Sequence, residues 1–382
     1  MQTTPSDRPL DILVLGATGF TGSLISEYLK HHCDHSQIKI GFAGRNVGKG
    51  HGLLNRLGLD TKNWWTVDIF DESSVYEAIG QTKVVINAAG PFAEYGPPVV
   101  AACVELGTHY LDITGEPSFF HDMRTTHHEK AQDQGVSIIH ACGFDSIPAD
   151  LGVRALVDRF HKKENITVEA FLKTNAQFSG GTWTTAIKAI DRQRKGGKKR
   201  VKRERDNVRK MPLKVHFNKR IKRWAMPMPV LDPHIVKTSA REMEEVYGDQ
   251  FAYGQYFTIK TWWKMAKLVM GIGSLFVLTR WRWGLNYLLN RNRPGTGPSE
   301  ERRQRSFFRF DFFASNGTQD EHLVIQAGDP GYIETAKMIS EAALMQLKRA
   351  KEGNHVPGVV TPSMAFGTKS LDRLVECGFE VE

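Results

Sequence analysis

Three glycines near the start of the chain have the spacing of a turn that binds a diphosphate. Residues 11–15 form a run of strand length, residues 16–22 read Gly-Ala-Thr-Gly-Phe-Thr-Gly, and residues 23–30 have helical character. Such a turn points backbone N–H groups at a pyrophosphate, and the dipole of the following helix adds partial positive charge. The pattern favours dinucleotide binding over glycines that merely end a strand. The residues expected at the pyrophosphate are Gly16, Ala17, Thr18, Gly19, Phe20, Thr21 and Gly22.

An arginine follows the next apolar run, where dinucleotide-binding domains distinguish the two nicotinamide coenzymes. Residues 38–43 lead into Gly44, Arg45 and Asn46, about twenty residues past the glycine turn, where an acid would bind the ribose of NAD. No acid occurs there, and the planar guanidinium of Arg45 suits a 2′-phosphate. The sequence predicts that NADP(H) is preferred, with Arg45 and Asn46 beside its phosphate, and leaves NAD(H) as an option. The alternative is an exposed loop arginine.

Two further turns complete the predicted cofactor site. Asp68 comes directly after the strand-like residues 64–67, a position from which its carboxylate could bind the adenine amino group. Ala88, Ala89 and Gly90 follow residues 83–86. Their small side chains would let the central ribose and phosphate of the cofactor approach the backbone.

Candidate catalytic residues lie in three polar clusters, residues 87–95, 112–116 and 142–150, each after a strand-like run. We expect these clusters to converge near the nicotinamide, with Tyr95, Asp145 and Ser146 as candidates for orienting the substrate or donating a proton. The alternative for Asp145 and Ser146 is helix capping, since both precede a proline-started helix. A Tyr-x-x-x-Lys match at Tyr256 and Lys260 lies in a strand-like stretch, which would separate the two side chains by about 13 Å. We interpret that match as coincidental.

A parallel sheet is the element that would bring these residues together. Alternating strand and helix patterns fit six βα units, so residues 1–150 are expected to form a Rossmann domain with a doubly wound parallel sheet in an α/β protein. A chain of 382 residues exceeds one ordinary domain, so residues 151–382 are expected to form a second, α+β domain with a mixed sheet for substrate binding and dimerisation. The sequence predicts strands at 166–174, 307–313 and 322–327, helices at 97–106, 121–134, 183–190, 332–348 and 372–377, and a flexible loop at 291–305.

A set of motifs spans nearly the whole chain and lies in residues 16–22, 43–46, 87–96, 108–116, 141–150, 328–332, 335–338 and 361–362. Together they resemble one known family, the saccharopine dehydrogenase-like oxidoreductases, which include the group called trans-acting enoyl reductases. The resemblance implies an N-terminal Rossmann domain, a second α+β domain and a reductase whose acceptor is often a lipid-linked acyl chain. It also implies association with lipid droplets or membranes, which some members show.

The positive charge of the chain is concentrated in one basic insertion. The net charge is +9, and residues 188–223 hold 17 lysines and arginines against three acids, a net +14, which leaves −5 for the rest. An anionic lipid surface fits this insertion better than nucleic acid, because no nucleic-acid recognition module accompanies it. The four cysteines lie far apart without a C-x-x-C pair, which favours a reducing compartment and no metal site.

An apolar segment at residues 262–289 suggests contact with a membrane surface. Its uncharged core, residues 268–279, is flanked on both sides by tryptophans and cations. Twelve helical residues cover about 18 Å, short of the roughly 30 Å hydrocarbon core, so the segment should lie in the interface rather than span it. The alternative is a buried core helix. Because the first eleven residues contain no apolar run typical of a signal peptide, we expect a cytoplasmic protein peripherally associated with a membrane or lipid droplet.

The combined interpretation is an NADPH-dependent oxidoreductase that reduces an enoyl or carbonyl group of an apolar or lipid-linked small molecule near such a surface. Two alternatives stay open. A saccharopine-type amino-acid dehydrogenase would need a polar pocket with several arginines to hold carboxylates. A non-catalytic NADP-binding scaffold at a lipid surface would keep the cofactor turn without a proton donor. A homodimer is compatible with all three interpretations.

Overall fold

The computed structural model describes residues 8–176, 187, 206–228, 230–291 and 298–382. The chain divides into two compact units. The first contains Met1–Ile147 and Tyr332–Cys377, and the second contains Pro148–Gly331 and Gly378–Glu382. The predicted helix at 183–190 lies outside the described residues except for residue 187, and so do residues 188–205 of the basic insertion.

The first unit contains a seven-stranded sheet in which every neighbouring pair is parallel. The strand order β13-β6-β5-β4-β1-β2-β3 reverses direction between β1 and β4, which is where doubly wound sheets bind nucleotides. The predicted Rossmann sheet is therefore confirmed. Its strands are β1 (Leu10–Leu15), β2 (Ile40–Gly44), β3 (Trp64–Thr66), β4 (Thr82–Asn87), β5 (His109–Asp112), β6 (Ser137–Ile139) and β13 (Gly358–Val360).

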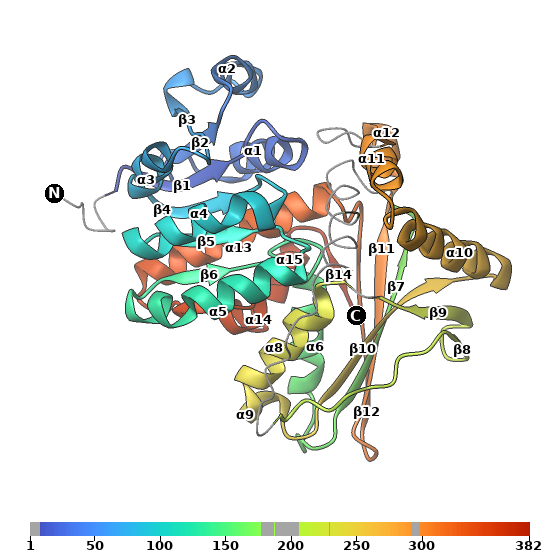
Figure 1. Ribbon diagram of the computed structural model, residues 1–382. Coiled ribbons are helices and arrows are strands. Elements are labelled where there is room, and N and C mark those ends of the chain that lie inside the picture. Colours follow the sequence, from blue (N-terminus) through green and yellow to red (C-terminus); the bar gives the residue numbers. More distant parts are fainter. Residues whose placement is uncertain (1–7, 177–186, 188–205, 229, 292–297) are drawn as a thin grey trace. The chain divides into compact units, whose positions relative to one another are not determined.

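Helices cover both faces of this sheet (Figure 1). On one side α3, α4 and α5 pack in succession, and on the other α1 packs against α13. The buried residues of α1, Gly22, Ile25, Ser26 and Leu29, recur at the spacing of one helix face, which explains why this segment folds as a helix on the sheet. The helices are α1 (Phe20–His32), α2 (Val47–Arg56), α3 (Glu72–Gly80), α4 (Phe92–Leu106), α5 (Pro117–Asp133), α13 (Ile333–Lys351), α14 (Pro362–Phe366) and α15 (Ser370–Glu376), with a short 3-10 turn η2 (Thr61–Asn63).

Two elements of this unit differ from the sequence-based expectation. Helix α4 begins at Phe92 rather than at residue 97, because the buried Glu116 carboxylate accepts a hydrogen bond from the Phe92 N–H and stabilises an earlier start. The C-terminal helix α13 packs on β1, β4 and β5, whereas the sequence analysis assigned residues 151–382 to one domain. Ala336, Ile339 and Ala343 of α13 are all buried, since the helix completes the cover of the parallel sheet.

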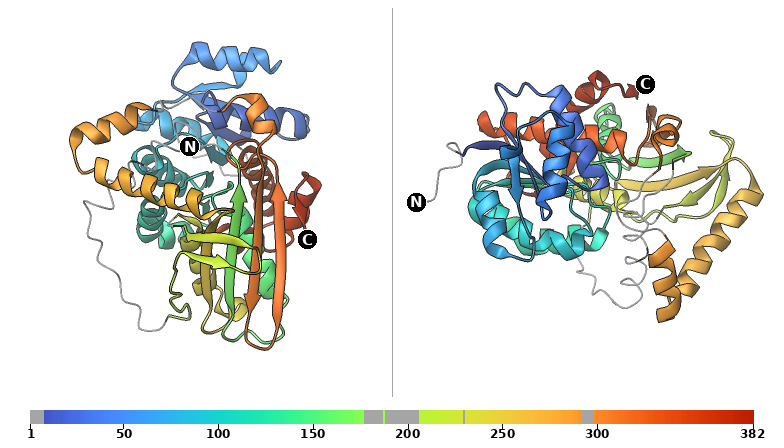
Figure 2. Two further views of the ribbon diagram at one scale, coloured as in Figure 1. Left: turned by 90° about the vertical axis from the view of Figure 1, so that its right-hand side faces the viewer. Right: turned by 90° about the horizontal axis from the view of Figure 1, so that it is seen from above.

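The second unit contains a seven-stranded mixed sheet in the order β14-β12-β11-β7-β10-β9-β8. The pair β7 and β10 is parallel and the other neighbouring pairs are antiparallel, which confirms the predicted mixed sheet. Figure 2 shows its long strands running side by side. The strands are β7 (Thr167–Thr174), β8 (His216–Asn218), β9 (Arg223–Pro227), β10 (Ala252–Ile259), β11 (Phe308–Ser315), β12 (Asp320–Ala327) and β14 (Glu380–Val381).

One face of the mixed sheet is covered by α6 (Ile147–Asp158) and α8 (Asp232–Glu242), which is followed by the short α9 (Glu244–Tyr247). Phe308, Phe310 and Phe312 alternate along β11 and are fully buried on this face. A Cβ atom at Gly152 of α6 would lie 3.1 Å from the Phe312 ring, so the helix needs glycine to approach the sheet this closely. The opposite face carries the polar residues of β11.

Three more helices follow β10. They are α10 (Trp262–Leu278), α11 (Arg282–Arg291) and α12 (Glu300–Gln304). Residues 292–297 of the loop expected at 291–305 lie outside the described residues. The expectation is wrong at residue 291, which ends α11, and at residues 300–304, where the Ser299 side chain caps α12 by accepting a hydrogen bond from the Arg302 N–H. Tyr256 lies on β10 as a strand residue and its ring stacks on Phe171, so the interpretation of the Tyr-x-x-x-Lys match as part of a strand is confirmed.

Candidate cofactor and active site

The glycine turn connects β1 to α1 in the geometry that a diphosphate needs. Gly16 has φ of +82°, a conformation that side-chain-bearing residues rarely adopt. A Cβ atom at Gly22 would lie 2.1 Å from the Gly16 carbonyl oxygen, so only glycine fits there. Helix α1 begins after Gly19 with no side-chain cap. The positive end of the helix dipole is therefore directed at the turn, where a phosphate would be stabilised.

The second small-residue turn lies directly against the first. A Cβ atom at Gly16 would be 2.9 Å from the Ala89 nitrogen, and the Ala88 N–H donates to the Leu15 carbonyl at 2.8 Å. The Asn87 Oδ1 atom accepts from the Ala89 N–H at 3.0 Å and fixes the turn. The structure thus places Ala88, Ala89 and Gly90 beside the glycine turn, as a shared cofactor site requires. Their contact with the ribose stays a prediction.

The residues predicted to bind the outer nucleotide follow β2 and β3. Arg45 is exposed at the end of β2, and no carboxylate of the described residues lies within ion-pair distance of it. Asn46 has a structural role that the sequence analysis missed, because its Oδ1 atom caps α2 by accepting from the Lys49 N–H at 2.9 Å. The exposed Asp68 carboxylate accepts from the Phe70 N–H at 3.1 Å. Cofactor contacts of all three remain predictions.

The three catalytic candidates have different neighbours. The Tyr95 ring, on α4, packs edge-on against Phe70 at 5.5 Å between centroids. Asp145 follows β6, and its carboxylate lies 3.4 Å from where a Gly115 side chain would begin, so the β5 and β6 ends do converge. Residue Asp145 is accessible to solvent, yet the protein atoms packed around its carboxyl group desolvate it and raise its pKa to about 6.

Ser146 has a hydrogen-bonding role of its own. It is fully buried, and its hydroxyl donates to the Asp145 carbonyl at 2.5 Å. The Ser146 N–H donates to the Gly143 carbonyl at 3.2 Å. Both groups bind the local backbone at the start of α6, which resembles the capping alternative more than a proton donor. Among the three candidates, Asp145 is the one whose raised pKa lies near neutrality, and its part in proton transfer stays a prediction.

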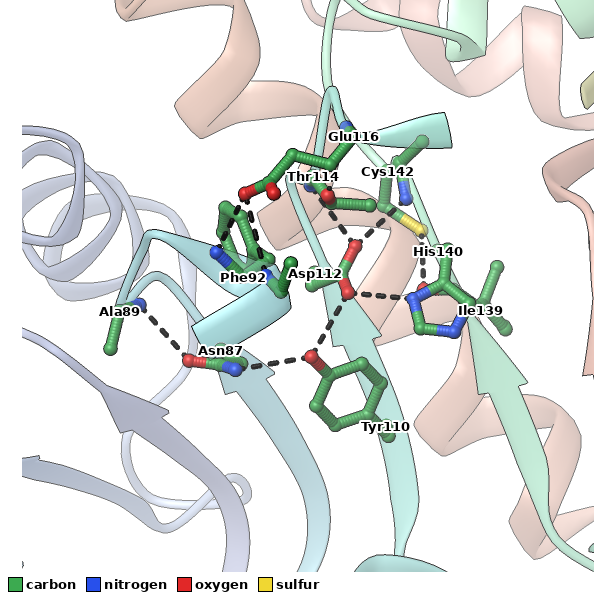
Figure 3. Close-up of polar contacts among 12 residues, drawn as sticks. Asn87, Ala89, Phe92, Tyr110, Asp112, Thr114, Glu116, Ile139, His140 and Cys142 are labelled. Carbon is green, nitrogen blue, oxygen red and sulfur yellow. Dashed lines mark hydrogen bonds and ion pairs between the residues drawn. The ribbon is translucent and has the colours of Figure 1, made fainter. Parts of the chain in front are cut away.

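A buried hydrogen-bond network connects the ends of β4, β5 and β6 (Figure 3). The Asn87 amide donates to the Tyr110 hydroxyl at 3.1 Å, and that hydroxyl donates to Asp112 Oδ2 at 2.9 Å. The Nδ1 atom of His140 lies 2.7 Å from the same oxygen. All four side chains are buried. The network therefore extends from the Ala89 turn, through Asn87, to the strand that precedes Asp145.

Asp112 is the centre of this network. Its Oδ1 atom accepts from the Thr114 N–H at 3.1 Å and from the Ala141 N–H at 2.9 Å. Ala141 has φ of +60°, a strained conformation that the second hydrogen bond helps to hold. Burial, and then the nearby Asp112 charge, raise the pKa of Tyr110 well above its ordinary value. Tyr110 thus stays a hydrogen-bond donor rather than a proton source.

His140 occupies an apolar environment. Its ring packs against Phe119 and Phe120 at 5.1 and 5.9 Å between centroids. Its Nε2 atom is buried with no hydrogen-bond partner in the described part of the chain. Since an ionised carboxylate only accepts, the geometry assigns the proton on Nδ1 to the hydrogen bond with Asp112.

Two of the four network residues lie in the polar clusters predicted from the sequence, but the network itself was not predicted. Asn87 and Asp112 fall in these clusters, and each ends a strand. Tyr110 and His140 are flanked by apolar residues in strand-like runs, which gives no sign of a polar network. The signal available was one polar side chain at or next to the end of each of three consecutive strands. Within the described residues, no three acidic, histidine or cysteine side chains gather as a metal site would require.

Comparisons with known proteins agree with this geometry. Residues 12–139 match the family model of the saccharopine dehydrogenase NADP binding domain. A saccharopine dehydrogenase-like oxidoreductase of Rattus norvegicus is 31% identical over 425 residues, covering 98% of this chain and 97% of the relative. A putative trans-acting enoyl reductase of Mycobacterium tuberculosis is 29% identical over 418 residues, covering 99% and 98% of the two chains.

A solved structure shares the fold. It is the apo form of saccharopine dehydrogenase (L-Glu forming) from Saccharomyces cerevisiae, with a TM-score of 0.58 and 13% identity over 98% of this chain and 99% of the other. At that identity the likeness concerns the fold alone. The sequence relatives and the domain match identify the family. The chain belongs to the saccharopine dehydrogenase-like family of oxidoreductases and binds NADP(H) through its N-terminal Rossmann domain.

Proposed function

We propose that this oxidoreductase uses NADPH to reduce an enoyl or carbonyl group of a lipid-type substrate at a membrane or lipid-droplet surface. The name of the mycobacterial relative, an enoyl reductase, supports the reaction. The bound cofactor supplies the hydride. The chain supplies the glycine turn for the pyrophosphate, Arg45 for the 2′-phosphate and the turn beginning at Ala88 for the ribose. Asp145, with its raised pKa, delivers the proton.

The observation that carries the surface part of the proposal is the exposure of the apolar side chains of α10 and α11. Trp263 is 76% exposed, Met270 66% and Trp283 64%. Met265 is the only buried residue of α10 among the described residues, which argues against the alternative of a core helix. A soluble protein rarely exposes so much contiguous apolar surface without a partner. Exposed cations accompany it: Lys264, Lys267, Arg280 and Arg282.

The geometry of α10 suits an interfacial position. Its 17 residues cover about 26 Å at the helical rise, less than the roughly 30 Å hydrocarbon core. Among the residues that the structure describes, no helix has the length and apolar character needed to cross a bilayer. Tryptophans with neighbouring cations favour the boundary between lipid headgroups and acyl chains. We therefore place α10 and α11 in the plane of the surface.

Turnover assays test the reaction. The full chain is mixed with NADPH and a panel of enoyl and keto lipids, and the loss of NADPH absorbance is followed. The proposal expects consumption with at least one unsaturated or keto lipid and none with saturated lipids of equal length. Turnover with amino-acid and keto-acid pairs alone would favour the saccharopine-type alternative. NADPH binding without any turnover would favour the scaffold alternative, and either result would overturn the proposal.

Liposome flotation tests the surface. Replacing Trp263, Met270 and Trp283 together by glutamine should release the protein from anionic liposomes, because these side chains provide the apolar contact. The control replaces Phe217 and Val375, which are 47% and 48% exposed on other elements, by glutamine. The control should float as the unmodified chain does. Equal flotation of all three proteins would show that α10 and α11 do not bind lipid.

A further inference from the structure

A cavity of about 440 Å³ lies on the face of the second unit's sheet that α6 and α8 leave uncovered. Its wall is built by side chains that share this face in neighbouring strands. Lys173 of β7 is paired in register with Arg309 of β11, and Phe171 is paired with Asp311. All of its lining residues belong to one unit: Phe171, Lys173, Arg220, Ile221, Arg223, Thr258, Arg309, Asp311, Phe313 and His322.

The cavity carries a strong excess of positive charge. Four of its lining residues are lysine or arginine, and one is a carboxylate. Arg309 is already neutralised, because its guanidinium contacts Asp311 at 2.9 Å and this hydrogen bond raises its pKa. Lys173, Arg220 and Arg223 have no carboxylate within 4.0 Å among the residues described. Three cations thus converge on one cavity, and no carboxylate of the described residues neutralises them.

An aromatic floor lies beneath these cations. Phe171 is 1% exposed, and its ring stacks on Tyr256 at 5.3 Å between centroids. Phe313 packs edge-on against Phe171 at 6.0 Å, and His322 stacks on Phe313 at 4.4 Å. The Arg220 guanidinium lies 5.4 Å above the Phe313 ring. Because the rings are held in place by one another, the floor beneath the cations is rigid.

We propose that this cavity binds a phosphorylated small molecule. Its phosphate contacts Lys173, Arg220 and Arg223, since arginine and lysine are the residues that recognise phosphate. Its apolar portion packs beside Phe313, which is half-buried. The volume lies in the range of about 300–1,000 Å³ typical of small-molecule sites. Its lining residues belong to the second unit, whereas the cofactor turn belongs to the first.

Calorimetry with phenyl phosphate tests the proposal. The full chain is first saturated with NADPH, so that the phosphate positions of the cofactor site are filled. Phenyl phosphate should bind, and benzyl alcohol, which has the ring without the charge, should not. Absence of phenyl phosphate binding, or equal binding of the two probes, would overturn the proposal.

Two double variants test whether phenyl phosphate binds in this cavity. Lys173→Gln combined with Arg223→Gln should weaken phenyl phosphate binding about tenfold or more. The matched control, Lys214→Gln with Lys219→Gln, removes two exposed cations that do not line the cavity and should leave the affinity unchanged. Equal affinities of both double variants would place the ligand elsewhere and exclude this cavity.

A third variant guards against loss of binding through misfolding. Asp311→Asn removes the one carboxylate among the described residues that line the cavity and releases Arg309 from its ion pair. We expect phenyl phosphate to bind about threefold to tenfold more tightly, because the repulsion between carboxylate and phosphate is gone. A gain in affinity does not arise from a damaged fold. An unchanged or weaker affinity would contradict the assignment of the phosphate to this cavity.

Discussion

The Nδ1 atom of His140 lies 2.7 Å from the Oδ2 atom of Asp112, and both side chains are fully buried. The contact joins the residues at the ends of β5 and β6. Asp112 also accepts hydrogen bonds from the Tyr110 hydroxyl and from two backbone N–H groups. A buried carboxylate with this many donors fixes its neighbours, since the loss of its charge would leave several donors without an acceptor. Asp112 is therefore a positioning residue for the candidate site.

We expect Asp112→Asn to lower the free energy of unfolding by about 3 kcal/mol. The amide group of asparagine would face the Tyr110 hydroxyl or the His140 Nδ1–H with a donor, where the carboxylate offers acceptors. Urea unfolding followed by tryptophan fluorescence measures the change. The control Asp133→Asn, at an exposed position of α5, should change stability by less than about 0.5 kcal/mol. Similar values for both variants would refute the role assigned to Asp112.

Alanine substitutions in the glycine turn should weaken NADPH binding and stability by different amounts. Gly22→Ala places a Cβ atom 2.1 Å from the Gly16 carbonyl oxygen, and Gly19→Ala places one at 3.1 Å from the same atom. Gly22→Ala should therefore abolish NADPH binding and cost about 2 kcal/mol or more of stability, with a smaller loss for Gly19→Ala. Gly52→Ala on α2, where nothing lies within 4 Å, should leave binding intact and raise stability by about 0.5 kcal/mol. NADPH titration by fluorescence and thermal unfolding check the order.

Arg45 makes a prediction about cofactor preference. Arg45→Asp should weaken NADPH binding about tenfold to a hundredfold, because a charge-assisted contact with the 2′-phosphate is replaced by repulsion. Binding of NADH, which lacks this phosphate, should change little. Arg56→Gln, at the exposed end of α2, serves as the control and should affect neither cofactor. If Arg45→Asp weakens both cofactors equally, Arg45 does not recognise the phosphate.

Two substitutions of Asn46 distinguish a cofactor contact from a capping role at the start of α2. Its Oδ1 atom accepts from the Lys49 N–H at the start of α2, so Asn46→Ala should cost about 1 kcal/mol of stability. Asn46→Asp keeps the capping oxygen and should retain that stability. The added negative charge beside Arg45 should nevertheless weaken NADPH binding if the 2′-phosphate lies there. Loss of stability in both variants would show that capping is not what Asn46 provides.

Much of the first unit could be predicted from the sequence because its signals are local. The glycine turn, the strands before it and after it, and the small residues at 88–90 each follow from short patterns with a fixed structural meaning. The start of α4 could not be predicted, since it depends on Glu116, a capping residue more than twenty positions away. The packing of α13 on the sheet of the first unit could not be predicted either. The sequence pattern predicts the helix, but which sheet the helix covers depends on tertiary packing.

The candidate site, too, could be predicted from the sequence only in part. The position of Asp145 after a strand makes it a candidate from the sequence alone, and the structure adds the desolvation that raises its pKa. The network of Asn87, Tyr110, Asp112 and His140 depends on three strands lying side by side in register. A polar residue inside a strand gives no sign of whether its neighbour across the sheet is a partner. Such pairs therefore become visible only when the register is known.

The ionisation of Asp145 should make both folding stability and the rate of reduction depend on pH. Desolvation raises its pKa from 3.8 to about 6, so between about pH 4 and pH 6 the folded chain keeps a proton that the unfolded chain releases. Folding stability should fall as the pH rises through this window, and Asp145→Asn, which cannot ionise, should remove that fall.

If Asp145 also donates the proton, the rate of reduction should decline above about pH 6, and Asp145→Asn should lower kcat about a hundredfold or more and abolish the decline. Asp372→Asn, an exposed position on α15, should change neither profile. A stability profile that shifts in Asp145→Asn while the rate profile keeps its inflection would assign the proton to another group, because the two measurements report the same carboxyl group through different properties.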